Sequence, residues 1–460
     1  MRRVIPWLLL VQTLPLWAAP PPPVQERLLE NGMKVIVKED HRAPIAVTQV
    51  WYKVGASYEP RGITGISHAL EHMMFKGTER HGPNQFSQII SEQGGQENAF
   101  TGDDYTAYFQ TLASDRLEIS FELEADRMRN LLLKQEEFAK EIKVVQEERR
   151  LRTEDKPKAL TYEQFNAAAY RVSPYRNPVI GWMNDLENMR VEDLREWYGR
   201  WYSPNNATLV VVGDVEPERI FQMAQLHFGE LKPSELKMLK PESEPAQLGE
   251  ARIRVKAPAQ QPYLLMGYKT PVVDREAKGD GEWEPYALEM LAAVLDGGGS
   301  ARFARELVRG ERVAVAASVD YEAFGRLPGM LTLDGIPAEG HNMAELEKAL
   351  RQQVERIKKE PVSEKEMERV RNQLLAAKVY ERDTVFYQAM RIGMMETIGL
   401  DWRLAENYVE RMKQITPEQV MKAAQKYLND DNLTVAELDP QPIKDKGFAK
   451  PLILGGRHGI

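Results

Sequence analysis

The sequence contains no cysteine and only 7 histidines among its 460 residues. The lack of cysteine excludes disulfide bonds, thiolate metal ligands, a cysteine nucleophile and a lipobox cysteine. The chain carries 61 basic and 69 acidic residues, a formal net charge of −8. This balance argues against a generic surface for nucleic acid or anionic membranes. The length predicts at least two domains, each with a substantial core.

Long hydrophobic runs are scarce as well, and the one at the N-terminus is short. Two arginines precede an apolar stretch from Val4 to Ala19, which two prolines interrupt and further prolines follow. Because about 20 residues are needed to cross a bilayer, the pattern favours a secretory signal peptide over residues 1–19 rather than a membrane anchor. No later segment predicts a transmembrane helix. Export without disulfides suggests the bacterial periplasm or cell envelope.

The remaining chain divides into two halves around a polar, proline-punctuated stretch at residues 232–250, which predicts an interdomain linker. Strand-like alternation and amphipathic helical patterns follow one another over residues 24–231. The same order returns over residues 251–442, before a short tail at 443–460. We therefore predict a duplicated α+β unit.

The motif His68-Ala-Leu-Glu71-His72 places two scarce histidines one helical turn apart. On a helix their imidazoles lie on one face and can reach a single metal ion at ~2.0–2.1 Å. Glu71 is turned about 100° from His72 and is placed to act on water at the metal. An accidental pairing of this form is expected in only ~1% of such chains. The pattern is HxxEH, the inverse of the HExxH zinc motif.

A catalytic zinc site usually has three protein ligands, and the absence of cysteine points to a carboxylate as the third. A predicted charged helix offers four candidates, between which spacing alone does not choose: Glu137, Glu141, Glu147 and Glu148. The two halves match best at an offset of about 225 residues. Under this offset the second half places three residues without histidine at the motif: Ala293, Asp296 and Gly297. We therefore expect metal chemistry in the first half only.

The motif, the "MMFKGT" that follows it and the downstream "VVQEERR" resemble the pitrilysin/insulinase family of zinc peptidases, which includes mitochondrial processing peptidase. The resemblance implies one Zn²⁺ per chain, held by His68, His72 and Glu148, with Glu71 as general base. It also implies that Glu141 supports the ligands from outside the coordination sphere. The expected function is a zinc-dependent endopeptidase that hydrolyses peptides or unfolded polypeptides.

The segment "GGQENAFTGDDYTAYF" resembles the edge strand beside the active site of this family. By this resemblance Asn98 and Ala99 hold the substrate backbone by strand addition. The implied fold has two homologous repeats, each a mainly antiparallel sheet flanked by helices, which together form half of a clamshell. The other half would come from a second subunit, in a homodimer or a heterodimer with a related inactive chain. Arg382 and Tyr387 are candidates for the arginine-tyrosine pair of the second half.

Two further interpretations compete with the peptidase. The fold family includes non-catalytic assembly or substrate-binding subunits, although these usually lack parts of the motif that this sequence keeps. A zinc hydrolase acting on substrates other than peptides is the other. The glycine-rich "LDGGGSARFARELV" resembles a family segment, and it lacks the lysine that a nucleotide-phosphate loop requires.

Overall fold

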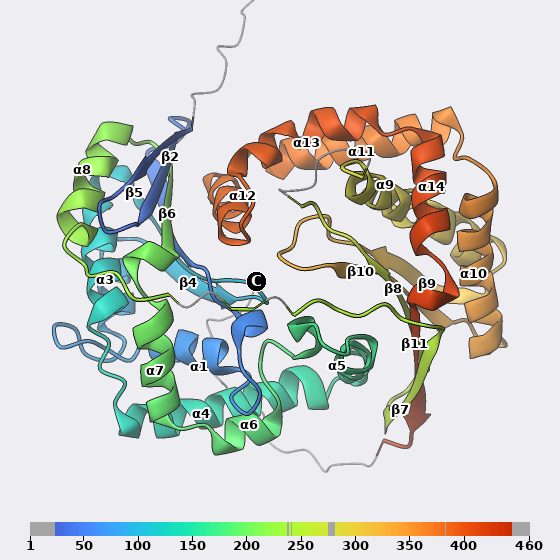
Figure 1. The fold of residues 1–460 in the computed structure, drawn as a ribbon, viewed down its shortest axis with the longest axis horizontal. Coiled ribbons are helices and arrows are strands. Elements are labelled where there is room, and N and C mark those ends of the chain that lie inside the picture. The colour runs from blue at the N-terminus through green and yellow to red at the C-terminus, as the bar shows by residue number, and fades with distance from the viewer. Residues whose placement is uncertain (1–23, 237–238, 241, 275–280, 382, 444–460) are drawn as a thin grey trace, which may run out of the picture.

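The computed structural model describes residues 24–443, except 237–238, 241, 275–280 and 382. The predicted signal peptide and most of the predicted tail lie outside the described residues. The chain forms two α+β halves side by side, each with a mainly antiparallel sheet and flanking helices (Figure 1). The predicted fold class is confirmed.

The sheet of the first half has six strands in the order β1-β2-β6-β3-β5-β4. β2 and β6 run parallel, and the other neighbours run antiparallel. The strands are β1 (Gln25–Leu28), β2 (Lys34–Glu39), β3 (Ile45–Tyr52), β4 (Gln96–Thr101), β5 (Thr106–Ala113) and β6 (Ala207–Gly213). β4 therefore lies at the edge of the sheet, as the resemblance implied.

The first half has eight α-helices in the described chain, and all but α5 belong to the layer around this sheet. They are α1 (Ile66–Met73), α2 (Gln85–Glu92), α3 (Glu118–Arg129), α4 (Gln135–Arg149), α5 (Pro157–Ala169), α6 (Met183–Asn188), α7 (Val191–Trp201) and α8 (Pro217–Phe228). The apolar stripe of α1 is buried in the core of the first half, and this burial sets the rotation of the helix about its axis. The histidines lie on the side of α1 opposite this stripe.

The second half repeats this plan with five strands in the order β7-β11-β8-β10-β9. The strands are β7 (Ala251–Pro258), β8 (Tyr263–Thr270), β9 (Ala314–Asp320), β10 (Gly329–Pro337) and β11 (Leu433–Gln441). The helices are α9 (Glu284–Asp296), α10 (Met343–Lys359), α11 (Glu364–Glu381), α12 (Val385–Thr397), α13 (Trp402–Gln414) and α14 (Pro417–Tyr427). Its parallel pair, β7 and β11, takes the place of β2 and β6.

The duplication is therefore visible in strand order, but its offset differs from the expected value around the motif. Corresponding elements start 218 residues apart at Ile45 and Tyr263, Ile66 and Glu284, and Gln96 and Ala314. The expected offset came from the last strands, beyond a β9–β10 connection that is longer than the β4–β5 connection. The positions that match the motif are Tyr286, Glu289 and Met290, instead of Ala293, Asp296 and Gly297. Neither set contains a histidine.

One helix from each half packs against the sheet of the other half. α5 of the first half packs on β7, β8 and β11, where Phe165 is buried with Leu265 and Leu438. α12 of the second half packs on β3 and β6, where Ile392 is buried with Trp51. Figure 1 shows both helices beside the sheet of the opposite half. Both sheets are thus covered by helices from the two halves.

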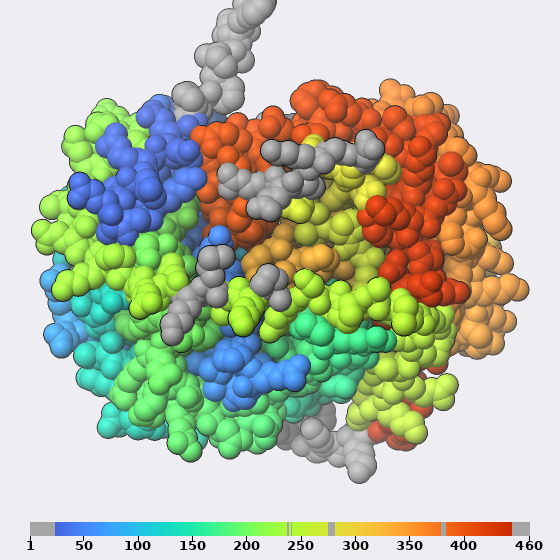
Figure 2. Space-filling model, in the orientation of Figure 1, coloured from blue at the N-terminus to red at the C-terminus, as the bar shows by residue number. Residues whose placement is uncertain are grey.

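Polar contacts reinforce this exchange along the outer surface. Lys34 on β2 pairs with Glu396 on α12 at 2.7 Å, and Arg403 on α13 pairs with Glu26 on β1 at 3.0 Å. In Figure 2 the orange-red surface of the second half lies directly against the blue N-terminal strands. The two halves therefore meet through both apolar and charged contacts.

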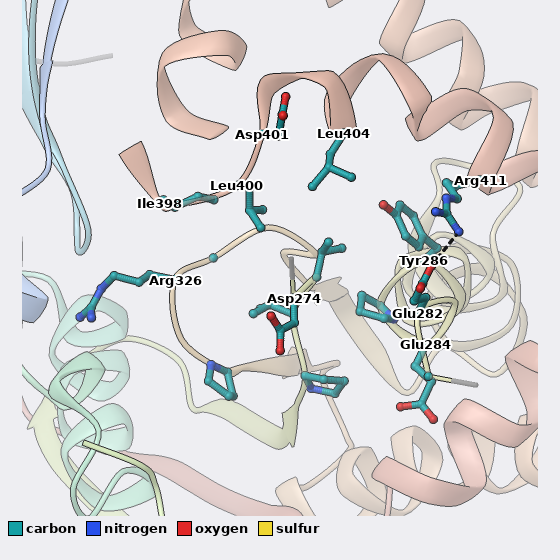
Figure 3. A pocket seen from close by; sticks show the side chains of 18 residues that line it. Asp274, Glu282, Glu284, Tyr286, Arg326, Ile398, Leu400, Asp401, Leu404 and Arg411 are labelled. Atoms are coloured by element: carbon teal, nitrogen blue, oxygen red, sulfur yellow. Dashed lines mark hydrogen bonds and ion pairs between the residues drawn. The ribbon is translucent and has the colours of Figure 1, made fainter. Parts of the chain in front are cut away.

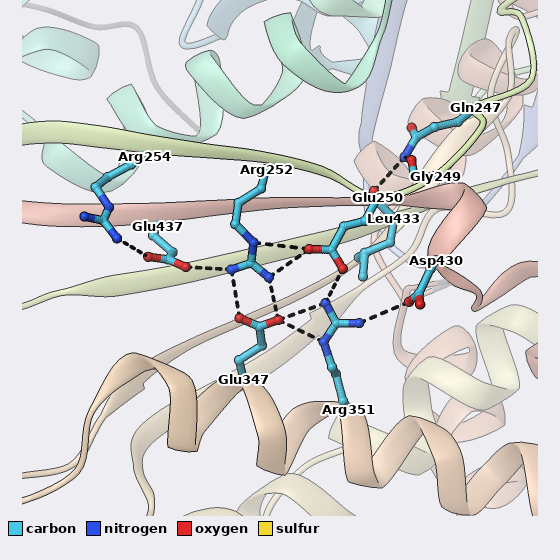
Figure 4. A network of polar contacts seen from close by, with 10 residues as sticks. All are labelled: Gln247, Gly249, Glu250, Arg252, Arg254, Glu347, Arg351, Asp430, Leu433 and Glu437. Carbon is cyan, nitrogen blue, oxygen red and sulfur yellow. Dashed lines mark hydrogen bonds and ion pairs between the residues drawn. The ribbon is translucent and has the colours of Figure 1, made fainter.

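The described part of the predicted linker forms neither helix nor strand, and two of its glutamates bind neighbouring segments. Glu244 accepts hydrogen bonds from the backbone N–H groups of residues 171–173 and pairs with Lys269 of the second half at 2.8 Å. Beyond it, Glu250 belongs to a surface network with Arg252, Glu347 and Arg351 (Figure 4). The domain boundaries drawn around this segment remain predictions.

Candidate metal centre

The helix that carries the motif begins with a glutamate cap from an earlier segment. Gly65 has a φ of 84°, and a Cβ there would lie 2.5 Å from the carbonyl oxygen of Ile180. Glu59 accepts the N–H of Gly65 at 2.6 Å and the N–H of Ser67 at 2.8 Å. Burial raises the pKa of Glu59 to about 8 despite these hydrogen bonds. The start of α1 is therefore fixed immediately before His68.

Packing of α1 against α4 brings His68 and His72 to Glu148. One ligand atom from each of the three residues lies within 4.8 Å of the others, and no other such group occurs among the described residues. Their side chains are only 12%, 5% and 15% exposed, in that order. Two imidazoles and a carboxylate are a donor set that zinc prefers, so these residues fit the ion that the resemblance implies.

The other glutamates of α4 make different contacts. Glu137 pairs with Lys140 and Glu147 with Arg150, both toward solvent. Glu141 lies 3.3 Å from Nδ1 of His72 and 2.7 Å from Nζ of Lys76. Of the four candidates, only Glu148 lies with both histidines.

Glu141 and Glu148 hold the His72 ring from its two nitrogens. Glu141 is at Nδ1, while Oε2 of Glu148 lies 3.4 Å from Nε2. Burial opposes the charged imidazolium, but the two carboxylates outweigh it and raise the pKa of His72 to about 9. Burial also opposes the charged form of Glu148 and would raise its pKa, yet the histidines and Arg152 lower this pKa to about 2. The two carboxylates thus face opposite nitrogens of one buried imidazole.

Glu71 is buried beside this group and is held by a residue that the sequence did not single out. Thr101, the last residue of β4, donates a hydrogen bond from Oγ1 to Oε2 of Glu71 at 2.5 Å. Burial raises the pKa of Glu71. Thr101 lies two residues after Ala99, and the alternation of a strand places both on one face. This periodicity was the signal that could have identified Thr101.

The predicted substrate-binding residues lie on the same edge strand. Asn98 and Ala99 pair with Phe109 and Tyr108 of β5, and among the described strands none pairs with the other side of β4. Oδ1 of Asn98 accepts the N–H of Ala99 at 3.0 Å. An edge of this kind can accept an extended peptide as a further strand.

The second half contributes less to the expected site. Tyr387 is 51% exposed near the start of α12, whereas Arg382 lies outside the described residues, so the arginine-tyrosine pair remains a prediction. A hollow of about 1350 Å³ opens between the end of β8, the start of α9 and the α12–α13 connection (Figure 3). All residues that line it belong to the second half, so it is separate from the His-His-Glu group.

Comparisons with known proteins agree with this architecture. The family described as insulinase, peptidase family M16, matches residues 34–182, and the domain described as peptidase M16 inactive domain matches residues 188–374. A zinc protease named PqqE from Helicobacter pylori is 35% identical over 63% of this chain and 64% of its own length, just under two thirds. An uncharacterized zinc protease from Rickettsia felis is 28% identical over 89% of this chain and 93% of its own.

Solved structures share the fold. A protease from Helicobacter pylori has a TM-score of 0.85 and 28% identity, over 91% of this chain and all of that one. The periplasmic protease PqqL from Escherichia coli has a TM-score of 0.74 at 16% identity, over 96% of this chain but only 52% of its own. Within the described residues, no helix combines the length and apolarity that a membrane crossing requires. Since successive parts of the chain match both M16 domains, and relatives of similar length are named zinc proteases, the chain belongs to the pitrilysin/insulinase family of M16 peptidases.

Proposed function

We propose that this protein is a zinc-dependent endopeptidase acting on peptides or unfolded polypeptides. His68, His72 and Glu148 would hold one zinc ion per chain. The observation that carries the proposal is the convergence of these three shielded donors within 4.8 Å, in a family whose relatives are named zinc proteases. When bound, zinc supplies Lewis-acid polarisation of the peptide carbonyl and lowers the pKa of water toward ~7.

The protein's own residues supply the remaining chemistry. Glu71 takes a proton from the attacking water on its carboxylate and passes that proton to the nitrogen of the leaving amine. The hydrogen bond from Thr101 fixes the orientation of this carboxylate. Burial raises the pKa of Glu71, which makes the carboxylate a stronger proton acceptor. Glu141 orients the His72 ring, and Asn98 and Ala99 align the peptide along β4.

The test is Glu71→Gln, which keeps the shape of the side chain and removes its basicity. Cleavage of a quenched peptide should fall by roughly 10²–10⁴-fold. Zinc content, measured by elemental analysis, should stay at one per chain. Glu289→Gln is the matched control, because Glu289 holds the corresponding position in the second half and accepts the Tyr408 hydroxyl at 2.6 Å. Full activity of Glu71→Gln, or an equal loss in Glu289→Gln, would contradict the assignment.

We also propose that the peptide chamber is completed by a second chain, either a copy of this one or a related inactive subunit. The fold covers only about half of the larger Escherichia coli neighbour, which supports a half-shell. Light scattering of the purified protein should give a dimer mass, and a homodimer should carry two zinc ions. A monomer with full activity is the contrary result.

Export to the bacterial periplasm or cell envelope is the proposed location. The N-terminal segment supports it, as does the family neighbour named a periplasmic protease. Fractionation of cells that express the full chain should place the protein in the periplasmic or envelope fraction. Recovery of the full-length chain from the cytoplasm alone would reject this location.

A further inference from the structure

The connection between β9 and β10 reaches from the second half into the first through Arg326. Nε of Arg326 donates to Oδ1 of Asp104 at 3.0 Å, and the backbone N–H donates to Oδ2 of the same residue at 3.2 Å. Nη2 donates to the hydroxyl of Ser57 at 2.7 Å and to its carbonyl oxygen at 3.2 Å. In Figure 3 the guanidinium points away from the hollow of the second half. The Arg326 side chain therefore binds two segments of the first half, one that contains Asp104 and one that contains Ser57.

The contacts around Arg326 are largely shielded from solvent, since its side chain is only 23% exposed. Asp104 is 5% exposed and also accepts from the hydroxyls of Ser57, at 2.6 Å, and Tyr175. The Tyr175 oxygen in turn accepts the N–H of Leu327 at 3.1 Å. The guanidinium lies over the ring of Tyr58, 4.4 Å from its centroid. Removal of Arg326 would leave the Asp104 carboxylate shielded without its cation, which is costly.

The first of these two segments, which contains Asp104, is connected to the proposed base Glu71. Asp104 lies in the turn between β4 and β5, three residues after Thr101, whose hydroxyl holds Glu71. The turn is tied to the second segment by two backbone bonds, from the N–H groups of Ala56 and Ser57 to the carbonyl oxygens of residues 102 and 103. Displacement of this turn therefore moves the end of β4 on which Thr101 lies.

The second of these two segments, which contains Ser57, is connected to α1, the helix that carries the motif. Ser57 lies in a short 3₁₀ helix, η1 (Ala56–Tyr58), which is followed directly by Glu59. Glu59 caps the first N–H groups of α1 at Gly65 and Ser67, next to His68. Arg326 therefore contacts both the segment that orients Glu71 and the segment that fixes α1.

We propose that Arg326 is a positioning residue for this site: its contacts with Asp104 and Ser57 couple docking of the second half to the relative placement of β4 and α1. The inference rests on the proposed peptidase function. The β9–β10 connection that carries Arg326 is longer than its first-half counterpart between β4 and β5. The second half lacks the metal-binding histidines and instead supplies this contact to the half that has them.

The experiment compares Arg326→Met with Lys34→Met in the full chain. In the described chain Lys34 pairs with Glu26 on β1 and, across the halves, with Glu396 on α12. Neither partner lies in the two segments that Arg326 contacts. Arg326→Met should lower kcat by roughly 10–100-fold, as small misplacements of reacting groups do, with KM and zinc content unchanged. Lys34→Met should keep kcat within about twofold. Arg326→Lys, which restores the charge to Asp104, should recover part of kcat. Equal kcat in the two methionine variants would overturn the inference.

A second measurement separates this inference from the proposed function. Hydrogen exchange of the metal-free protein should become faster at the N–H groups of Gly65 and Ser67 in Arg326→Met, and should not change there in Lys34→Met. If the wild type bound no zinc and cut no peptide, the proposed function would fail while this measurement would still apply. Unchanged protection at both positions would overturn the role of Arg326 in either case.

Discussion

Glu71 depends on a single described hydrogen bond for its orientation, the one from Thr101 across the gap between α1 and β4. Helical spacing places Glu71 beside the histidines, but it does not specify the carboxylate's rotation. The hydroxyl of Thr101 fixes this rotation by donating a hydrogen bond to Oε2 of Glu71 at 2.5 Å. A general base must be oriented as well as basic, since proton transfer requires hydrogen-bond geometry with the substrate water.

Replacement of Thr101 tests this orientation directly. Thr101→Val keeps the shape of the side chain and removes the donor, and we expect kcat to fall by about tenfold, equivalent to the roughly 1.4 kcal/mol of one hydrogen bond to a charged group. Thr101→Ser keeps the hydroxyl and should retain most of the activity. Steady-state kinetics with a quenched peptide measure both. Equal rates for valine and threonine at this position would show that the bond is dispensable.

At the residue scale, the sequence predicted the two histidines and Glu71 from spacing alone, because helical periodicity is local. It left four glutamates open as the third ligand. Their separation reflects long-range packing: rotation of α4 against α1 turns Glu148 toward the histidines and Glu137 and Glu147 toward solvent. A charged helix encodes no such rotation in its own spacing, so from the sequence only the family resemblance, and not the spacing, pointed to Glu148.

The junction of α4 and α5 is the element on which the position of Glu148 depends. The next residue, Arg149, makes a buried two-pronged pair with Glu163 on α5, at 2.7 and 3.0 Å. Its guanidinium also lies 5.7 Å from the ring centroid of Trp182. The pair therefore ties α4, which carries the proposed ligand Glu148, to α5, the helix that crosses to the second sheet.

Arg149→Met should destabilise the protein by roughly 3–5 kcal/mol, because Glu163 would keep a buried charge without a partner. Arg150→Met is the neighbouring control. Arg150 pairs with Glu147 at 3.0 Å on the surface, so its loss should cost only ~0–1 kcal/mol. Denaturant unfolding of both variants measures the difference. Similar losses for the two would show that burial of the Arg149 pair contributes little.

The pKa of Glu244 predicts that the attachment of the linker to the two halves depends on pH. Burial alone would raise the pKa of Glu244, but hydrogen bonds from the backbone of residues 171–173 and from Lys269 lower it from 4.5 to about 2. A carboxyl with a lowered pKa in the folded state stabilises the fold above pH 4.5, and this contribution is lost as pH falls toward 2. Acid should therefore weaken the attachment of the linker.

We expect Glu244→Gln to lower the Tm clearly at pH 7, and the gap from the wild type to narrow progressively below pH 4.5. Glu235→Gln serves as control, because Glu235 is exposed in the same segment. Its Tm should stay close to that of the wild type at both pH values. A Glu244→Gln gap that is constant from pH 7 to pH 3.5 would contradict the assigned role of the carboxylate charge.

At the scale of the whole molecule, the exchange of α5 and α12 makes each sheet depend on both halves. α12 approaches the first sheet so closely that a Cβ at Gly393 would lie 2.1 Å from Nε1 of Trp51. The buried indole is also held by a hydrogen bond to Gln49 at 2.9 Å. It has little freedom to move aside, so glycine at 393 sets the distance between helix and sheet.

Gly393→Ala should therefore be destabilising, with overpacking of roughly 1–3 kcal/mol outweighing the gain of up to ~1 kcal/mol in helix propensity. Gly199→Ala on α7 should be stabilising by a similar propensity gain, since a Cβ there meets nothing within 4 Å. Opposite signs in urea unfolding would support the close contact. A stabilising Gly393→Ala would show that α12 can shift away from the sheet without cost.

The sequence by itself determined the α+β class, the duplicated order of its elements and the histidine pair, because each depends on a local period or a repeated segment. The tertiary structure alone decided the offset around the motif, the position of Glu148 beside both histidines, the contact of Thr101 with Glu71 and the contact of Arg326 with the other half. It also decided which sheet each crossing helix covers. These features join residues far apart in the chain, such as Trp51 and Gly393, and their energy comes from burial and hydrogen bonds that form only when both halves are folded together.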